Sequence, residues 1–111
     1  MVTLKLLDES EVIEKYDFLE YKIFQKGFYI KIKAYIKDNS ELFIREYSDE
    51  YERNYSYHWQ KKDGSLLIRW DNAPHYKDIT TFPHHKHIGN KVLPSNENIL
   101  KDVLEFIKKT I

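Results

Sequence analysis

Five histidines are the residues of this sequence best suited to acid–base chemistry, and four of them lie close together. His75, His84, His85 and His87 fall within 13 residues, and the fifth is His58. A histidine ring takes up or releases a proton near neutral pH, as a general base or acid must. Two such rings can cleave RNA, one removing the 2′-hydroxyl proton and the other protonating the leaving oxygen. These histidines are therefore the first candidates for catalytic residues.

A predicted β-hairpin places His58 beside two charged side chains. Asp63-Gly64 is a strong signal for a hairpin tip, because this pair favours a tight type I′ turn. With the pair at the tip, His58 lies opposite Arg69, and Asp71 follows on the same face. Asp71 can orient a histidine, and Arg69 can bind phosphate and stabilise transition-state charge. The opposite face of the hairpin is apolar and carries Tyr57, Trp59, Ile68 and Trp70.

The histidine-rich segment 83–87 has three interpretations. It can be a solvated loop whose histidines have no chemical role. It can be a transition-metal site, because imidazole binds Zn, Ni or Fe and His85 and His87 can present two ligands together. It can also carry out acid–base chemistry on phosphodiesters. The sequence has no HExxH pattern, no cysteine pair and no acidic cluster of the two-metal nuclease kind, so we expect no metal and no other cofactor.

The elements that must position these residues are mostly strands. Residues 27–37 alternate between apolar and polar side chains, which predicts a half-buried antiparallel strand. Its polar face alternates tyrosine with lysine, and it either stacks bases and contacts phosphates or is simply solvated. The turn-forming residues 38–40 predict a hairpin to a second strand over 41–49. The register we expect pairs Ile36 with Leu42.

The late segment and the two ends complete the pattern. Residues 72–95 lose periodicity and hold all three prolines, which predicts a long irregular connection. From Asn96 apolar residues recur at helical spacing, which predicts a C-terminal helix. Near the start we expect a short helix over residues 10–15 and a strand over 17–25. The expected fold is therefore α+β: a single domain over 1–111, in which the C-terminal helix covers an antiparallel sheet of about four to six strands with hairpins at 38–40 and 63–64.

Composition excludes several classes of protein. The chain has 18 basic and 18 acidic residues, so it does not coat nucleic acid by bulk charge. The charge is uneven, since residues 1–50 hold 8 basic and 11 acidic side chains while residues 51–95 hold 7 and 4. A local phosphate site is therefore compatible with overall neutrality. Without cysteine no disulfide forms, and without a long apolar run we expect no membrane span and a cytoplasmic protein.

Three segments and a triplet carry a resemblance to a known family. They are Tyr55–Gln60 (YSYHWQ), Leu67–His75 (LIRWDNAPH), Thr81–His87 (TFPHHKH) and Arg45-Glu46-Tyr47. Together with the C-terminal helix they resemble the TumE family of prokaryotic toxin–antitoxin systems. The resemblance implies a growth-inhibiting toxin that cuts RNA and a small helix-turn-helix antitoxin encoded beside it. The positions that match the family motif are His58, Arg69, Asp71, Asn72, His75, His84, His85, Lys86 and His87.

Together these observations predict the toxin component of a type II toxin–antitoxin module, a metal-independent endoribonuclease. The expected catalytic residues are His58, Arg69, Asp71, His75, His84 and His85. The expected substrate-binding residues are Lys86, His87 and Asn72. Two alternatives stay open: a non-catalytic module that binds RNA or protein, and a metal-dependent hydrolase that uses the 75–87 segment. The sequence leaves the oligomeric state open, a homo-oligomer included.

Overall fold

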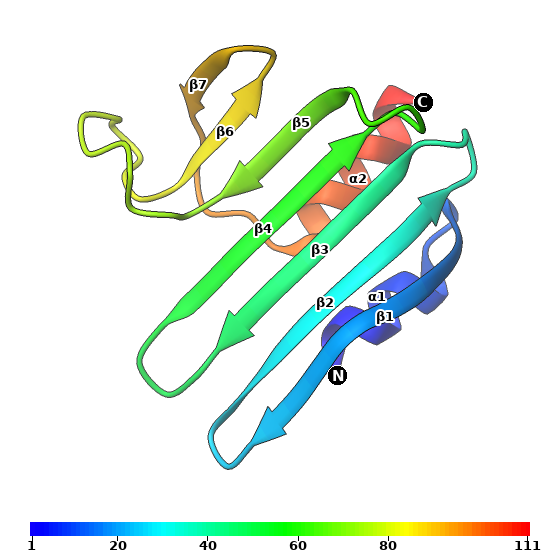
Figure 1. Cartoon of the computed structure of the whole chain (residues 1–111), viewed down its shortest axis with the longest axis horizontal. Helices are drawn as coiled ribbons and strands as arrows, with labels where there is room; N and C mark the ends of the chain where they lie inside the picture. The colour runs from blue at the N-terminus through cyan, green and yellow to red at the C-terminus, as the bar shows by residue number, and fades with distance from the viewer.

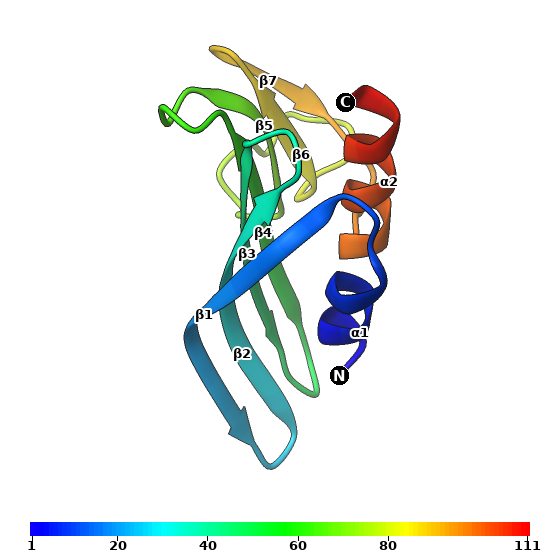
Figure 2. The ribbon, with the colours of Figure 1, turned by 90° about the vertical axis from the view of Figure 1, so that its right-hand side faces the viewer.

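The computed structural model describes all 111 residues as one seven-stranded antiparallel sheet with two helices on a single face (Figures 1 and 2). The strands are adjacent in chain order and hydrogen-bond as an uninterrupted meander. Their bounds are β1 Ile13–Phe24, β2 Gly27–Ile36, β3 Glu41–Ser48, β4 Arg53–Gln60, β5 Leu66–Asp71, β6 His85–Ile88 and β7 Lys91–Pro94. The helices are α1 Val2–Glu9 and α2 Leu100–Thr110. The α+β class is confirmed, but the sheet has more strands than expected.

The hairpin between β2 and β3 forms in a register two residues away from the predicted one. Ala34 pairs with Leu42, and the amide of Ile36 donates to the carbonyl of Ser40 at 2.9 Å. Ser40 therefore closes the turn instead of lying inside it. Asn39 adopts a positive φ of 74°, which lets a three-residue loop reverse the chain. A shift of two preserves the side-chain alternation, so the predicted apolar and polar faces are correct.

The hairpin between β4 and β5 has the predicted pairing but a different turn. Trp59 pairs with Ile68, and His58 pairs with Arg69. The amide of Gly64 donates to the carbonyl of Lys61 at 2.9 Å, and only Gly64 has a positive φ in this turn. The type I′ turn expected at 63–64 is therefore wrong. A longer turn shifts the register by one residue, and a bulge next to Trp59 shifts it back.

Three other predictions about the elements are corrected. The first helix ends at Glu9 and β1 begins at Ile13, where a helix over 10–15 and a strand over 17–25 were expected. Within the expected irregular segment 72–95, residues 85–94 form the hairpin of β6 and β7. Strand β6 forms because β5 offers it an unpaired edge, a tertiary contact that single-strand periodicity does not reveal. The C-terminal helix begins at Leu100, four residues later than expected, and the Asp102 side chain accepts the amide of Ile99.

The core lies between the two helices and the apolar face of the sheet. Alternate residues of β2, β3 and β4 point to this side and are buried, and one face of each helix covers them (Figure 2). The buried apolar residues are Leu7, Val12, Ile13, Ile30, Ile32, Ala34, Ile36, Leu42, Ile44, Tyr55, Tyr57, Trp59, Trp70, Leu100, Val103, Leu104 and Ile107. Burial of this apolar surface is the main force that holds the helices to the sheet. Neither helix is long and apolar enough to cross a membrane.

A buried polar network anchors α1 to the sheet. The Glu46 carboxylate accepts hydrogen bonds from the hydroxyls of Thr3 and Tyr57. Arg53 donates to the Tyr57 hydroxyl at 2.8 Å and lies 4.0 Å from Glu46. Burial, followed by the charge of Glu46, raises the pKa of Tyr57 far above its ordinary value. Because a buried carboxylate is costly without partners, this network fixes the position of α1 in a way that apolar packing alone would not.

Candidate functional site

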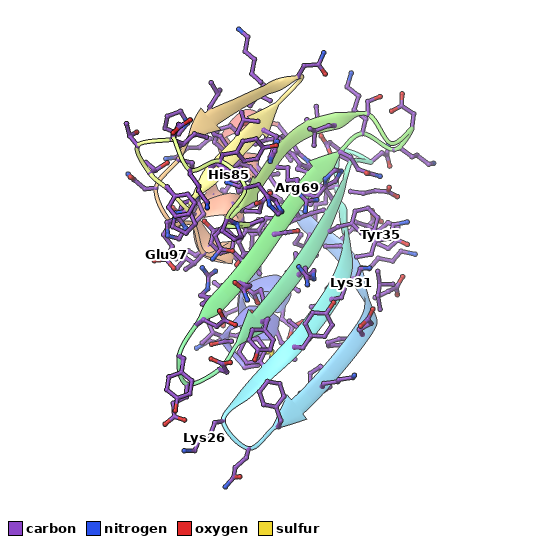
Figure 3. The ribbon with its side chains drawn as sticks, turned by 60° about the vertical axis from the view of Figure 1, so that its left-hand side comes forward. Lys26, Lys31, Tyr35, Arg69, His85 and Glu97 are labelled. Atoms are coloured by element: carbon purple, nitrogen blue, oxygen red, sulfur yellow. The ribbon has the colours of Figure 1, made fainter.

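The polar side chains with chemical potential gather on the face of the sheet that the helices leave open. Residues of β2 to β5 line two shallow, adjoining pockets there. Arg45, Ser56 and Arg69 line both pockets, so the two form one groove. In Figure 3, Arg69 and His85 lie on the neighbouring strands β5 and β6, with Lys31 further across the sheet on β2. The groove is therefore basic, although the whole chain is neutral.

At the floor of the groove, His58 and Arg69 contact each other across β4 and β5. Nη1 of Arg69 lies 3.3 Å from Nδ1 of His58, and an arginine nitrogen only donates. Nδ1 of His58 therefore accepts, so Nε2 carries the proton and donates to Oε1 of Gln60 at 3.2 Å. Burial, and then the charge of Arg69, lowers the pKa of His58 below its ordinary value. The ring is thus held neutral, in the form that a general base needs.

Asp71 is the centre of the second part of the site. Its side chain is buried and receives the Arg69 Nε at 3.0 Å and the backbone amide of Ala73 at 3.0 Å. Two histidines of β6 approach the same carboxylate: His85 Nε2 is 2.9 Å from Oδ1, and His87 Nε2 is 3.4 Å from Oδ2. Asp71 therefore holds Arg69 from one side and faces two imidazoles on the other.

His85 is almost completely buried, at 1% exposure. Its Nδ1 lies 3.0 Å from the carbonyl oxygen of Pro83. A carbonyl only accepts, so Nδ1 carries a proton and donates it. Nε2 is close to Asp71 but makes no hydrogen bond, because the approach lacks hydrogen-bond geometry. The ring of Tyr76 packs edge-on against both His85 and His87, and it covers this part of the sheet from the 72–84 loop.

The structure brings His58, Arg69, Asp71, His85 and His87 to one face, where Asn72 also lines the groove. It places the other expected site residues elsewhere. His84 lies against the opposite side of the sheet, with Nδ1 2.9 Å from the Tyr55 hydroxyl. Lys86 pairs with Trp70 and shares its helix-covered side.

Asn72 and His75 make no hydrogen bond with the histidines of the cluster, although Asn72 lines the groove. Asn72 ties two strand ends together, since its side chain accepts from the amide of Tyr55 and donates to the carbonyl of Arg53. Its polar groups are thus already used in the fold. His75 is exposed in the loop, and its backbone amide donates to the carbonyl of Ala73.

Four residues that shape this site were not among the expected site residues: Lys31, Arg45, Gln60 and Tyr76. Arg45 pairs with Ser56 and Lys31 pairs with Arg45 in the observed registers. The correct β2–β3 register would have placed both cations in line with the His58 hairpin. No local signal identifies Tyr76, because its contacts depend on the path of the loop over β6.

The fold and the site define a small α+β protein with a basic, histidine-bearing groove on the uncovered face of an antiparallel sheet. A family comparison is consistent with the motifs. Residues 3–111 match the family described as toxin TumE, so the chain belongs to the TumE toxin family. A search of curated proteins gave no significant match, and a search of solved structures gave none either. Membership of a toxin family implies an antitoxin partner.

Proposed function

We propose that this protein is a toxin that cleaves RNA bound along the open face of the sheet. The observation that carries the proposal is the contact between a neutral His58 and Arg69 at the floor of a basic groove. One group can accept a proton and the other can bind the phosphate next to it. Arg45 and Lys31 line the same groove and supply further positive charge to hold an RNA backbone.

The chemistry we propose begins with an exchange of partners at Arg69. When a phosphate enters, the Nη groups of Arg69 turn to its oxygens, while the Nε–Asp71 contact holds the side chain in place. Nδ1 of His58 is then free to take the proton of the neighbouring 2′-hydroxyl. The resulting oxyanion attacks phosphorus and the bond to the 5′-oxygen breaks. Arg69 stabilises the negative charge of the transition state.

The second proton transfer differs from the scheme predicted from the sequence. That scheme shared the base and acid roles between His58 and one of His75, His84 or His85. His75 is exposed, His84 faces the other side of the sheet and His85 is buried against Asp71. We therefore assign the proton for the leaving oxygen to solvent water, which reaches the open groove.

Aromatic side chains beside the groove support single-stranded RNA as the substrate. Tyr29, Tyr35 and Phe43 lie on the polar face of β2 and β3, and all three are partly exposed. Arg45 lies over the ring of Tyr29, and Lys33 lies over the rings of Tyr35 and Phe43. Alternating cations and rings on a sheet surface are suited to contact phosphates and stack bases.

RNA cleavage by purified protein tests the proposal. We expect His58→Ala combined with Arg69→Ala to abolish cleavage, and each single change to lower it at least 100-fold. Lys101→Ala on α2 removes a charge from the helix side and should leave the rate unchanged. Full activity in the double variant would overturn the assignment. Activity that persists in EDTA supports metal-independent cleavage, and RNA binding without cleavage by the wild type would identify a binding module instead.

We also propose that the partner is a helix-turn-helix antitoxin encoded beside the toxin gene, and that it docks on the outer edge of β1. This edge strand has no neighbour on one side. It exposes the large apolar residues Phe18, Leu19, Tyr21, Ile23 and Phe24. An uncovered edge with exposed apolar side chains is a favourable surface for another chain to pair with. Inducible expression with and without the neighbouring gene tests the pairing: growth should stop without it and recover with it.

A further inference from the structure

We propose that Asp71, His85 and His87 form a binding site for a divalent first-row transition metal ion. The ligand atoms of these three side chains lie within 4.8 Å of one another. Metal–ligand bonds of about 2.0–2.2 Å place ligand atoms roughly 3–4 Å apart, so small side-chain rotations suffice to close the site. Two imidazoles and one carboxylate are a ligand set that selects transition metals over Mg²⁺ or Ca²⁺.

The unpartnered nitrogen of His85 is the observation that points to a cation. Its side chain is 1% exposed, and Nε2 makes no hydrogen bond although it faces the Asp71 carboxylate at 2.9 Å. Because Nδ1 donates to Pro83, Nε2 is the ring nitrogen left for another ligand, and the nearby carboxylate does not satisfy it by a hydrogen bond. A metal ion bound by both Nε2 and the Asp71 carboxylate would satisfy this buried nitrogen.

The surroundings hold the three ligands as metal sites generally require. The carbonyl of Pro83 fixes the tautomer and orientation of His85. The amide of Ala73 and the Nε of Arg69 hold the two Asp71 oxygens. His85 and His87 are two residues apart on β6, so both rings point to the same side of the sheet, and Tyr76 packs on both. This outer layer pre-organises the site before an ion arrives.

The proposed metal site shares Asp71 with the proposed RNA cleavage, since Asp71 also holds Arg69. Zn²⁺ binding can nevertheless be tested separately, because it is measured without RNA and His58 is not among the ligands. Calorimetric titration of the purified, metal-stripped protein with Zn²⁺ should give one ion bound per chain. Mg²⁺ should give no heat at the same concentration, because the ligand set is rich in nitrogen. Zn²⁺ should also raise the melting temperature, since an ion that binds only the folded chain stabilises it.

Variants separate this site from adventitious binding to other histidines. We expect His87→Asn and Asp71→Asn to weaken Zn²⁺ binding at least tenfold, and His75→Ala, which removes an exposed histidine of the same region, to leave it unchanged. Circular dichroism of each variant shows whether it is folded. His87 is the least buried of the three ligands, so its variant keeps the test decisive if the others unfold.

Co²⁺ should give a visible absorption spectrum that His87→Asn abolishes. Failure of Zn²⁺ to bind stoichiometrically, or an equal loss in His75→Ala, would overturn the proposal.

Discussion

Nη1 of Arg69 donates to Nδ1 of His58 across the β4–β5 pair, and this contact of 3.3 Å sets the protonation state of the candidate base. An imidazolium at His58 would place an N–H against the guanidinium, so the arrangement favours the neutral ring. The same arginine is held by Asp71 at its other end. One side chain therefore links the groove with the buried Asp71–histidine cluster.

Replacing Arg69 with lysine separates charge from geometry. We expect Arg69→Lys to lower RNA cleavage by about tenfold or more, because an ammonium keeps the charge but cannot contact Asp71 and a phosphate as a planar fork does. His58→Asn should lower it by about 100-fold or more, since the amide oxygen still accepts from Arg69 but takes no proton. Single-turnover cleavage of a labelled RNA measures both. A rate in Arg69→Lys equal to that of the wild type would contradict the role given to the guanidinium.

The stability of the protein should decrease at mildly acidic pH because of His58. Its pKa is near 6.5 in the unfolded chain and lower in the folded chain, where burial and Arg69 disfavour the charged ring. Between these two pKa values the unfolded state binds more protons, so the free energy of unfolding falls as pH falls. One such group gives a slope of at most about 1.4 kcal/mol per pH unit. Well above pH 6.5 the ring is neutral in both states, so His58 causes no loss of stability there.

Denaturant unfolding at pH 7.5, 6.5 and 5.5 measures this dependence. The His58→Asn variant lacks the titrating ring, so its stability should decrease less over the same range than that of the wild type. Identical pH profiles for the two proteins would show that His58 has the same pKa in the folded and unfolded states.

Docking of the C-terminal helix depends on apolar burial. The side chain of Ile107 is fully buried between α2 and the sheet. We expect Ile107→Ala to lower the free energy of unfolding by about 2–5 kcal/mol, through lost burial and the cavity that remains. Lys101→Ala on the exposed side of the same helix should change it by less than about 0.5 kcal/mol. Urea unfolding followed by tryptophan fluorescence measures both, and similar losses in the two variants would contradict this packing.

The hydroxyl of Tyr57 should contribute to stability beyond its ring. Tyr57→Phe leaves the buried Glu46 without one donor and Arg53 without one acceptor. We expect a loss of about 1–3 kcal/mol in the free energy of unfolding. Tyr51 is 88% exposed, so Tyr51→Phe is the matched control and should be neutral. An equal effect in both variants would exclude the network as the cause.

The outer edge of β1 should be needed for neutralisation by the antitoxin but not for toxicity. Ile23 is 66% exposed, so Ile23→Lys should change stability by less than about 0.5 kcal/mol while it disrupts apolar docking. We expect this variant to stop growth even when the antitoxin is co-expressed. Ile111→Lys replaces an equally apolar residue that is 49% exposed at the chain end and should be neutralised normally. Neutralisation of both variants would remove β1 from the interface.

The sequence predicted the local order of the central hairpins well. Alternation in β2 identified its buried face, and the Asp63-Gly64 signal gave the pairing of His58 with Arg69 even though the turn is longer. These features are local, because strand period and turn chemistry depend on neighbouring residues. The predicted β2–β3 register was wrong by two residues. Alternation could not detect this error, because a shift by an even number of residues leaves the pattern of faces unchanged.

Only the tertiary structure divided the histidines among different environments. In the sequence they form one cluster with His58 apart. In the fold, β6 pairs with the free edge of β5 and brings His85 and His87 to Asp71, while the odd spacing along the chain sends His84 to the opposite side. Composition and motif therefore determined the residue types and the family. Strand pairing between distant segments decided which of those residues meet, because side-chain direction alternates along a strand and the partner strand is chosen by contacts far away in sequence.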